Sequence, residues 1–247
     1  MIPVTDPLLL ASFLAAAGLA AVHLFSAALR VLDGIPRHEL LSAAGGIAVA
    51  YVFLGLLPAL SEHQATVEAA VQGGPLAKLE SHAYIVALAT LILFYALERV
   101  ARASKRSGPQ AKTSTKVFWL HISLFALENA LIGYLLLQAE NRTLLTLLLF
   151  SVAMMLKFVV NDHSLHDLHK DAYDGAGRWL LAGAVFLGWG IGAGLALPAI
   201  GPALLEAFLA GAVILNVLKE ELPEERQARI WPFALGALAY GLLLLVI

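Results

Sequence analysis

The stretch Val117–Ala139, VFWLHISLFALENALIGYLLLQA, determines how the rest of the chain is interpreted. It is apolar for longer than the roughly 20 residues that an α-helix needs to cross the hydrocarbon core of a bilayer. Its single charged residue is Glu128. In hydrocarbon every backbone N–H and C=O group must find a partner within the protein, and a helix supplies all of these partners internally. The stretch therefore predicts a membrane-spanning helix.

The composition of the whole chain agrees with this interpretation. Of its 247 residues, 60% are hydrophobic and 14% are charged, against about 45–50% and about 25% in soluble domains. These values exclude a water-soluble globule, a disordered chain, collagen and a coiled coil. The absence of cysteine excludes disulfides, iron–sulfur clusters and thiolate zinc sites. A net charge of −2 gives no electrostatic basis for binding nucleic acid.

Eight apolar stretches predict an all-α polytopic membrane protein, with one transmembrane domain embedded in a lipid bilayer. The stretches are 8–32, 40–60, 82–98, 117–139, 143–160, 179–197, 202–218 and 231–247. The first is interpreted as a span rather than a signal peptide, because Asp6 precedes it and no basic segment does. The residues 101–116 between the third and fourth spans are expected to form a cytoplasmic linker.

The distribution of basic residues predicts the orientation of these spans. With the 101–116 linker inside the cell, all but two of the 16 Lys and Arg residues lie at inner ends, the exceptions being Lys78 and Arg142. This asymmetry is what the positive-inside rule expects. Both termini are then extracytoplasmic. The short loops and the lack of sorting signals indicate a bacterial inner membrane.

A weak internal repeat relates two of the spans. Gly46–Pro58, GIAVAYVFLGLLP, and Gly211–Pro223, GAVILNVLKEELP, share a Gly at the same distance from a Leu-Pro pair. The two copies run in opposite directions across the membrane. One interpretation is an inverted repeat of spans one to three and six to eight around spans four and five, a feature typical of transporters. The other is a chance similarity between two apolar helices.

Polar residues within the spans are candidates for an ion pathway, because ionisable groups in hydrocarbon usually face a bundle interior or a cavity. His121 and Glu128 are two helical turns apart and share a face, and Asn129 adjoins them. Their side chains are plausible ligands for a divalent cation. Alternatively, Glu128 pairs with Lys157 or is protonated, and Asn129 bonds a neighbouring helix. Further pathway or charge-partner candidates are Lys157, Asn216 and Glu220. His23 is interpreted as a hydrogen-bonded packing residue.

A polar cluster, NDHSLHDLHKD at Asn161–Asp171, follows the fifth span. If it is helical, one face carries Asp162, His166, His169 and Tyr173, and a second pair consists of His163 and Asp167. Imidazoles and a carboxylate on one face suit zinc, iron or manganese. The alternative is a solvated helix end. The segment 174–177, DGAG, is expected to break the helix before the sixth span.

Three stretches, Ala44–Ala59, Glu128–Gly133 and Ala207–Glu225, are similar to the second, fourth and seventh helices of the ZIP family of divalent-metal transporters. The number of spans, the outside termini and the cytoplasmic linker also resemble the family pattern. The resemblance implies an eight-helix fold with the inverted repeat, a divalent metal ion as substrate and the formation of homodimers.

The chain departs from the family at the residues that would hold metal. Leu124 stands where the family's fourth helix usually carries a His, and Gly55 stands where its second helix carries one. The segment Phe150–Lys157 replaces a His-Glu motif and contains no carboxylate. Only Glu128 and Asn129 carry over by position. A Lys at this place would repel a metal ion, or would replace one ion by neutralising a carboxylate.

Three functions therefore remain open. The first is a divergent ZIP-like transporter that moves a divalent cation past Glu128, Asn129 and His121. The second is a ZIP-fold scaffold or regulator that has lost transport. The third is a membrane-embedded metal-dependent hydrolase, with metal on the face that carries His166 and Asp167 or Asp171 as the base.

Overall fold

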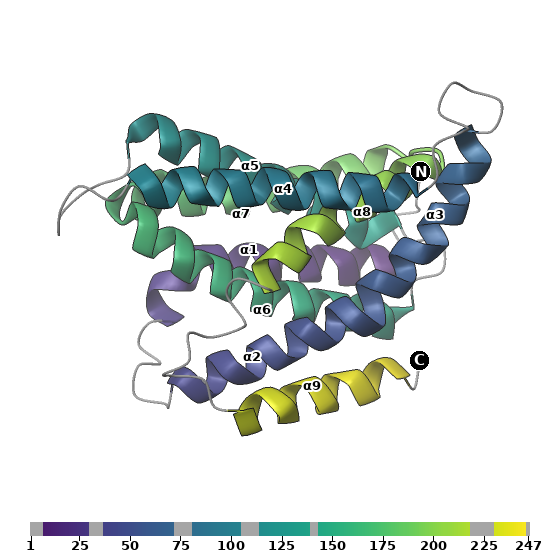
Figure 1. Ribbon diagram of the computed structural model, residues 1–247, viewed down its shortest axis with the longest axis horizontal. Helices are drawn as coiled ribbons and strands as arrows, with labels where there is room; N and C mark the ends of the chain where they lie inside the picture. Colours follow the sequence, from purple (N-terminus) through teal and green to yellow (C-terminus); the bar gives the residue numbers. More distant parts are fainter. Residues whose placement is uncertain are drawn as a thin grey trace. The chain divides into compact units, whose positions relative to one another are not determined.

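The computed structural model consists of helices and short connections in the part that it describes (Figure 1). The described residues are 7–29, 37–71, 81–104, 114–138, 143–217 and 230–245. The chain divides into two compact units, the first formed by 1–34 and 94–196 and the second by 35–93 and 197–247. Helix α4 (His82–Ser104) contributes residues to both.

Unit 1 contains, besides the end of α4, the helices α1 (Pro7–Leu29), α5 (Thr115–Gln138), α6 (Leu144–His169), η3 (Tyr173–Gly177) and α7 (Arg178–Gly194). Unit 2 contains α2 (Arg37–Tyr51), η2 (Val52–Leu56), α3 (Leu57–Val71), the start of α4, α8 (Ile200–Asn216) and α9 (Ile230–Leu245). The elements η2 and η3 are single wide turns of π-helix. Because η2 joins α2 to α3 without a break, the chain is helical from Arg37 to Val71.

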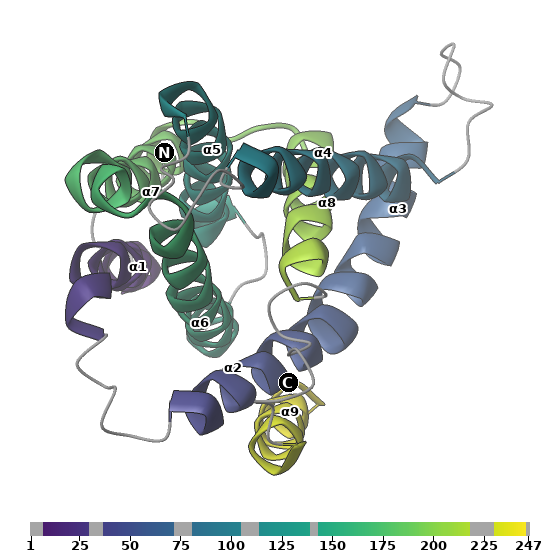
Figure 2. The ribbon, with the colours of Figure 1, turned by 60° about the vertical axis from the view of Figure 1, so that its left-hand side comes forward.

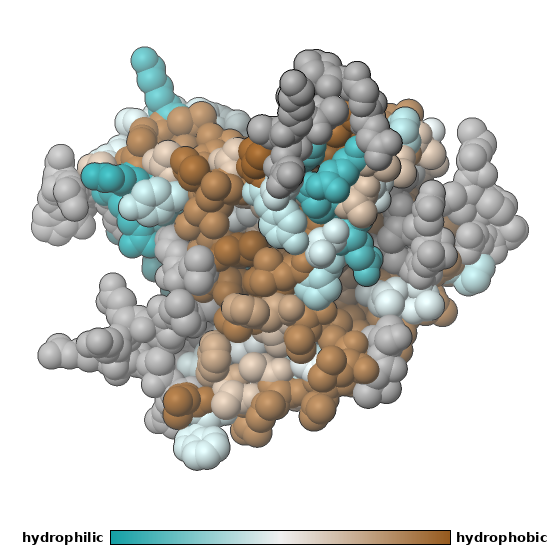
Figure 3. Space-filling model, turned by 45° about the vertical axis from the view of Figure 1, so that its right-hand side comes forward, coloured by the Kyte–Doolittle hydropathy of each residue, from teal (hydrophilic) through white to brown (hydrophobic). Residues whose placement is uncertain are grey.

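The helices are those of an integral membrane protein. Among the described residues, six helical segments are long and apolar enough to cross a bilayer, and α8 and α9 are shorter apolar helices. Large apolar side chains such as Leu88, Leu148 and Leu187 point outward and are more than half exposed. Brown apolar residues accordingly cover much of the coloured surface in Figure 3. Such a surface is unfavourable in water and suits lipid.

Each predicted apolar stretch overlaps a described helix, and several helices are longer than predicted. The second continues to Val71 and the fifth to His169. A hydropathy window ends where the apolar residues end, whereas the i to i−4 hydrogen bonds of a helix continue through polar residues. For the same reason α4 runs through Ser104, so the start of the 101–116 linker is helical. Residues 105–113 lie outside the described part.

The predicted helix break at 174–177 is wrong. These residues belong to η3, which leads directly into α7. The chain instead turns at Lys170, which has a φ of 45° and donates its backbone N–H to the His166 carbonyl oxygen. A residue with positive φ after the last helical turn is a common way to end a helix. The turn ends α6 directly after His169, which fixes that imidazole at the helix terminus.

Within unit 1, α1, α5, α6 and α7 pack against one another, as both ribbon views show (Figures 1 and 2). The backbones of α5 and α7 approach so closely that a Cβ atom on Gly188 would lie 1.8 Å from the Ala130 carbonyl oxygen. Small residues at such crossings are typical of membrane helices. The Trp189 indole N–H donates to Ser12 Oγ at 3.1 Å and ties α7 to α1. Helix α6 packs against α1 and α5 and carries five of the 15 buried polar or charged residues in the described part.

Candidate functional site

The interior of unit 1 contains a row of ionisable side chains along α6. Lys157, Asp162 and His169 are each no more than 5% exposed. An ionisable group at the centre of a spanning helix costs at least about 2.5 kcal/mol, so each is expected to meet a polar partner. The structure supplies these partners from two other helices, α1 and α5.

The deepest of these contacts is an ion pair between α5 and α6. Lys157 Nζ lies 2.8 Å from Glu128 Oε1, and the Glu128 side chain is completely buried. Within the described residues neither side chain has a further hydrogen-bond partner. The pair is therefore the described polar contact of both groups. This is the arrangement that the second interpretation of Glu128 describes.

A second contact joins α1 to α6. His23 Nδ1 lies 2.8 Å from Asp162 Oδ1, and the exposed fractions of the two side chains are 1% and 2%. Because a carboxylate only accepts hydrogen bonds, the imidazole Nδ1–H donates. The His23 ring also packs on Phe158, with centroids 4.4 Å apart. His23 is thus hydrogen-bonded, as the sequence suggested, and its partner is a residue of the predicted metal-binding face.

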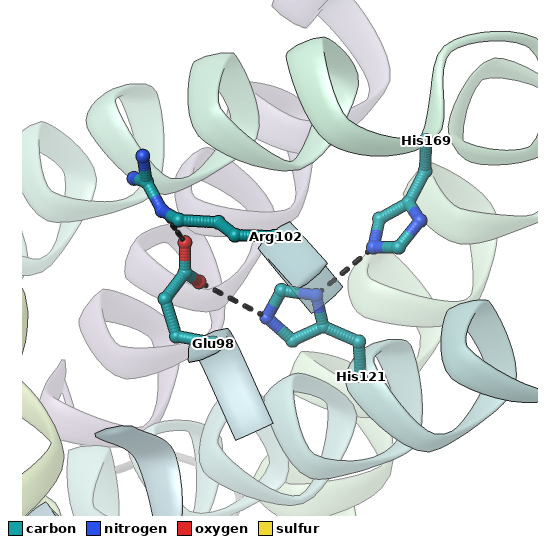
Figure 4. Close-up of polar contacts among 4 residues, drawn as sticks. All are labelled: Glu98, Arg102, His121 and His169. Carbon is teal, nitrogen blue, oxygen red and sulfur yellow. Dashed lines mark hydrogen bonds and ion pairs between the residues drawn. The ribbon is translucent and has the colours of Figure 1, made fainter. Parts of the chain in front are cut away.

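A third group joins α4, α5 and α6, and Figure 4 shows it. His121 Nδ1 lies 2.9 Å from His169 Nε2, and His121 Nε2 lies 3.6 Å from Glu98 Oε2. The other oxygen of Glu98 accepts from Arg102 Nε at 2.7 Å. The Arg102 side chain is 59% exposed, whereas the His121 side chain is 2% exposed. The group therefore extends from the surface of unit 1 to its interior.

The remaining candidates on α6 lie further out. His163 Nε2 is 3.5 Å from Asp167 Oδ2, and His166 Nε2 is 3.3 Å from Asp174 Oδ2. Asp167 is exposed and His163 is partly exposed. The structure thus does not bring Asp162, His166 and His169 to one point, because each meets a partner from a different element.

No group of three or more His, Asp and Glu side chains that could hold a metal ion occurs among the described residues. His121 shows the geometric reason. It presents its two ring nitrogens to Glu98 and His169, and these nitrogens lie on opposite sides of the imidazole. A single ion cannot bind both of them. In the structure His121 and His169 are therefore hydrogen-bonded to each other.

Three predicted residues have no described ionic contact. Asn129 is 2% exposed in unit 1, and Asn216 is 7% exposed near the end of α8 in unit 2. Glu220 lies outside the described residues.

Sequence reasoning missed Glu98 and Arg102 as members of a site. Glu98 was the last residue of a predicted span, and Arg102 lay in the predicted linker. Their spacing of four residues, which favours an ion pair on a helix, was the available signal. It also missed a pair in unit 2, where His63 Nε2 lies 2.6 Å from Glu206 Oε2.

Comparisons with protein-family models, with curated proteins and with solved structures found no match. The function therefore has to be argued from the residues and contacts of the chain itself.

Proposed function

We propose that the chain is a membrane transporter of a divalent metal cation, with a ZIP-like arrangement of eight spans. The observation that carries the proposal is the pair formed by Glu128 and Lys157. Glu128 lies near the middle of a helix long enough to cross the membrane, and no part of its side chain is exposed. A carboxylate in such a place is a group that binds a cation, and intramembrane ionisable residues commonly mark ion pathways.

The pair supplies a way to exchange one cation for another. Lys157 places a single positive charge 2.8 Å from Glu128 Oε1, on a flexible four-carbon stem that can withdraw. A divalent ion carries twice that charge and would compete for the same carboxylate. The buried Asn129 adjoins Glu128 and offers an amide oxygen. Oxygen ligands of this kind suit manganese and iron, and zinc also accepts carboxylates.

The helix packing supports the inverted repeat. A Cβ atom on Gly46 of α2 would lie 2.0 Å from the Phe233 carbonyl oxygen of α9, and one on Gly211 of α8 would lie 2.0 Å from the Ala87 carbonyl oxygen of α4. A rotation that exchanges spans one to three with spans six to eight would place α2 on α8 and α9 on α4. The crossing of α2 with α9 would then become the crossing of α8 with α4. The rotation would also relate the packing of α5 on α7 to that of α6 on α1, which is observed as well. Such repeats are typical of secondary transporters.

Uptake into vesicles tests this proposal. We expect the purified chain in liposomes to take up at least one of Zn²⁺, Mn²⁺ and Fe²⁺, as reported by a metal-sensitive dye inside. Glu128→Gln is expected to lower the initial rate by about tenfold or more, since a charge-assisted ligand contact is worth about 1.5–3 kcal/mol. The control is Glu68→Gln, the same change at an exposed carboxylate of α3. Equal uptake by the Glu128 and Glu68 variants would contradict the proposal.

The same ion pair favours a second candidate, a scaffold or regulator of this fold that no longer transports. Here Lys157 occupies the cation position permanently. Native protein would then take up none of the three ions, and the double variant Glu128→Gln, Lys157→Met would fold and lack uptake as the native chain does. Uptake by the native protein decides against this candidate.

A further inference from the structure

The contacts among Glu98, His121 and His169 are not used by the proposed cation exchange at Glu128, yet they join three helices and are largely buried (Figure 4). We propose that these three side chains form a proton-binding site, through which unit 1 takes up one proton from solvent and releases it in exchange for the transported metal. Proton binding stands on this geometry alone, whereas the exchange with metal rests on the proposed function.

The contact between the two rings limits the site to one proton. At 2.9 Å, His121 Nδ1 and His169 Nε2 share a hydrogen bond, in which one nitrogen donates and the other accepts. One added proton makes one ring an imidazolium and leaves that hydrogen bond intact. A second would place two N–H groups and two positive charges against each other. The pair therefore binds one proton where two separate histidines would bind two.

Glu98 and Arg102 set the charge of the site and connect it to solvent. Without the added proton, the carboxylate of Glu98 and the guanidinium of Arg102 balance each other. Arg102 Nε holds one carboxylate oxygen at 2.7 Å, and the other oxygen faces His121 Nε2 at 3.6 Å. Because Arg102 is mostly exposed and Glu98 is 8% exposed, a proton from water reaches the rings by way of Glu98.

Aromatic side chains of α5 also line the site. The Phe118 ring packs against His169 with centroids 5.2 Å apart, and the Phe125 ring packs against His121 at 5.1 Å. Both phenylalanines lie on α5. Among the described contacts, the charged or titratable groups that lie against the two rings are Glu98, on α4, and each ring for the other. Arg102 acts on them through Glu98.

The transfer itself needs no reagent other than the proton. A rotation of the Glu98 side chain first closes the 3.6 Å gap. The carboxylic acid of Glu98 then gives its proton to the lone pair of His121 Nε2, so Glu98 becomes a carboxylate and His121 an imidazolium. The imidazolium can pass the proton on its Nδ1 to His169 Nε2. No covalent bond other than these N–H and O–H bonds forms or breaks.

Proton binding is tested by solid-state NMR of the full chain in lipid bilayers, with ¹⁵N-labelled histidine and single His→Gln variants for assignment. We expect the His121 and His169 signals to change together over one pH interval, with uptake of one proton by the pair. Each ring should titrate separately once the other is replaced. Independent uptake of one proton by each ring in the native chain would overturn the proposal, and so would the absence of any titration.

Proton exchange is tested in vesicles that contain a pH-sensitive dye. We expect the interior to become more alkaline as metal enters native vesicles, because protons leave. In Glu98→Gln this proton signal should fall by about 100-fold, the effect of removing a proton donor and acceptor. The control, His63→Gln, removes a histidine of unit 2 that also has a carboxylate partner, and its proton signal should equal the native one.

The outcomes separate the two proposals. Metal uptake without any pH change overturns the proton exchange and leaves the proposed function intact. A proton signal that survives in both Glu98→Gln and His169→Gln overturns the assignment of these residues. If no metal enters native vesicles, the proposed function and the exchange both fail, and the NMR measurement alone decides whether the site binds a proton.

Discussion

The two units share one kind of helix crossing but differ in what they bury. Both contain crossings where a glycine allows two backbones to meet, at Gly188 in unit 1 and at Gly46 in unit 2. Unit 1 encloses the Glu128–Lys157 ion pair within its bundle. In unit 2 the described ion pair is His63 with Glu206, whose side chains are 24% and 18% exposed.

This difference indicates that helices of this chain can pack around a core without a buried ion pair, as in the described part of unit 2. Unit 2 forms its described core from apolar side chains such as Leu60, Ala87 and Ala207. Replacing a buried ion pair by apolar residues of similar volume is often neutral or stabilising, since the charges lose their hydration on burial. Under the proposed function, a transported ion is the reason for the charges at the centre of these spanning helices.

The largest expected difference between the two units comes from removing one member of the buried ion pair. Lys157→Met leaves the Glu128 carboxylate without its cation, and we expect a loss of about 3–5 kcal/mol of folding free energy. Thermal unfolding in detergent measures it. The double variant Lys157→Met, Glu128→Met should recover most of that loss. If the double variant instead loses the sum of what Lys157→Met and Glu128→Met each lose alone, the two charges do not act as a pair.

A smaller effect tests whether the packing of the two units is equivalent. Gly188→Ala places a Cβ atom 1.8 Å from the Ala130 carbonyl oxygen, and Gly46→Ala places one 2.0 Å from the Phe233 carbonyl oxygen. In both variants the helices must move apart, and we expect each to lose about 1–3 kcal/mol of stability. Denaturation of both variants under the same conditions is the measurement. A loss confined to one of them would show that the crossings differ.

The smallest expected effect is the difference in stability loss between replacing a buried histidine and replacing a partly exposed one. His23→Gln removes a contact to Asp162 between side chains that are 1% and 2% exposed. The carboxylate then stays buried, so we expect a loss of about 1–3 kcal/mol. His63→Gln removes a partly solvated pair, for which about 0–1 kcal/mol is expected. Equal losses in a shared unfolding assay would contradict the distinction between the two interiors.

The helices could be predicted because a single long apolar segment in hydrocarbon can pair all of its backbone N–H and C=O groups internally only as a helix. The ion pair of Glu128 and Lys157 was open to inference for a related reason, since two opposite charges in adjacent spans stabilise each other. The division into two units could not be predicted. Each unit combines segments from distant parts of the chain, and their composition is similar throughout.

The contacts of the histidines lay beyond sequence reasoning. The pattern on α6 predicted a shared face for Asp162 and His169, which helical periodicity supplies. It gave no information on which other helix each residue meets. His23 and Asp162 are 139 residues apart, and His121 and His169 are 48 apart. Contacts at such separations depend on tertiary packing, and local spacing rules do not extend to them.

The wide turn η2 at Val52–Leu56 has a consequence for how this chain tolerates length changes. A π turn accommodates one more residue than an α-helical turn without interrupting the helix. Deleting one residue there would let the segment close into regular α-helix, and the side chains of α3 would keep nearly the same direction around the axis, because the wide turn is where the extra residue is held. The face of α3 that meets α8 would stay in place. Deleting one residue from the regular part of α3 would instead rotate every later side chain by about 100°.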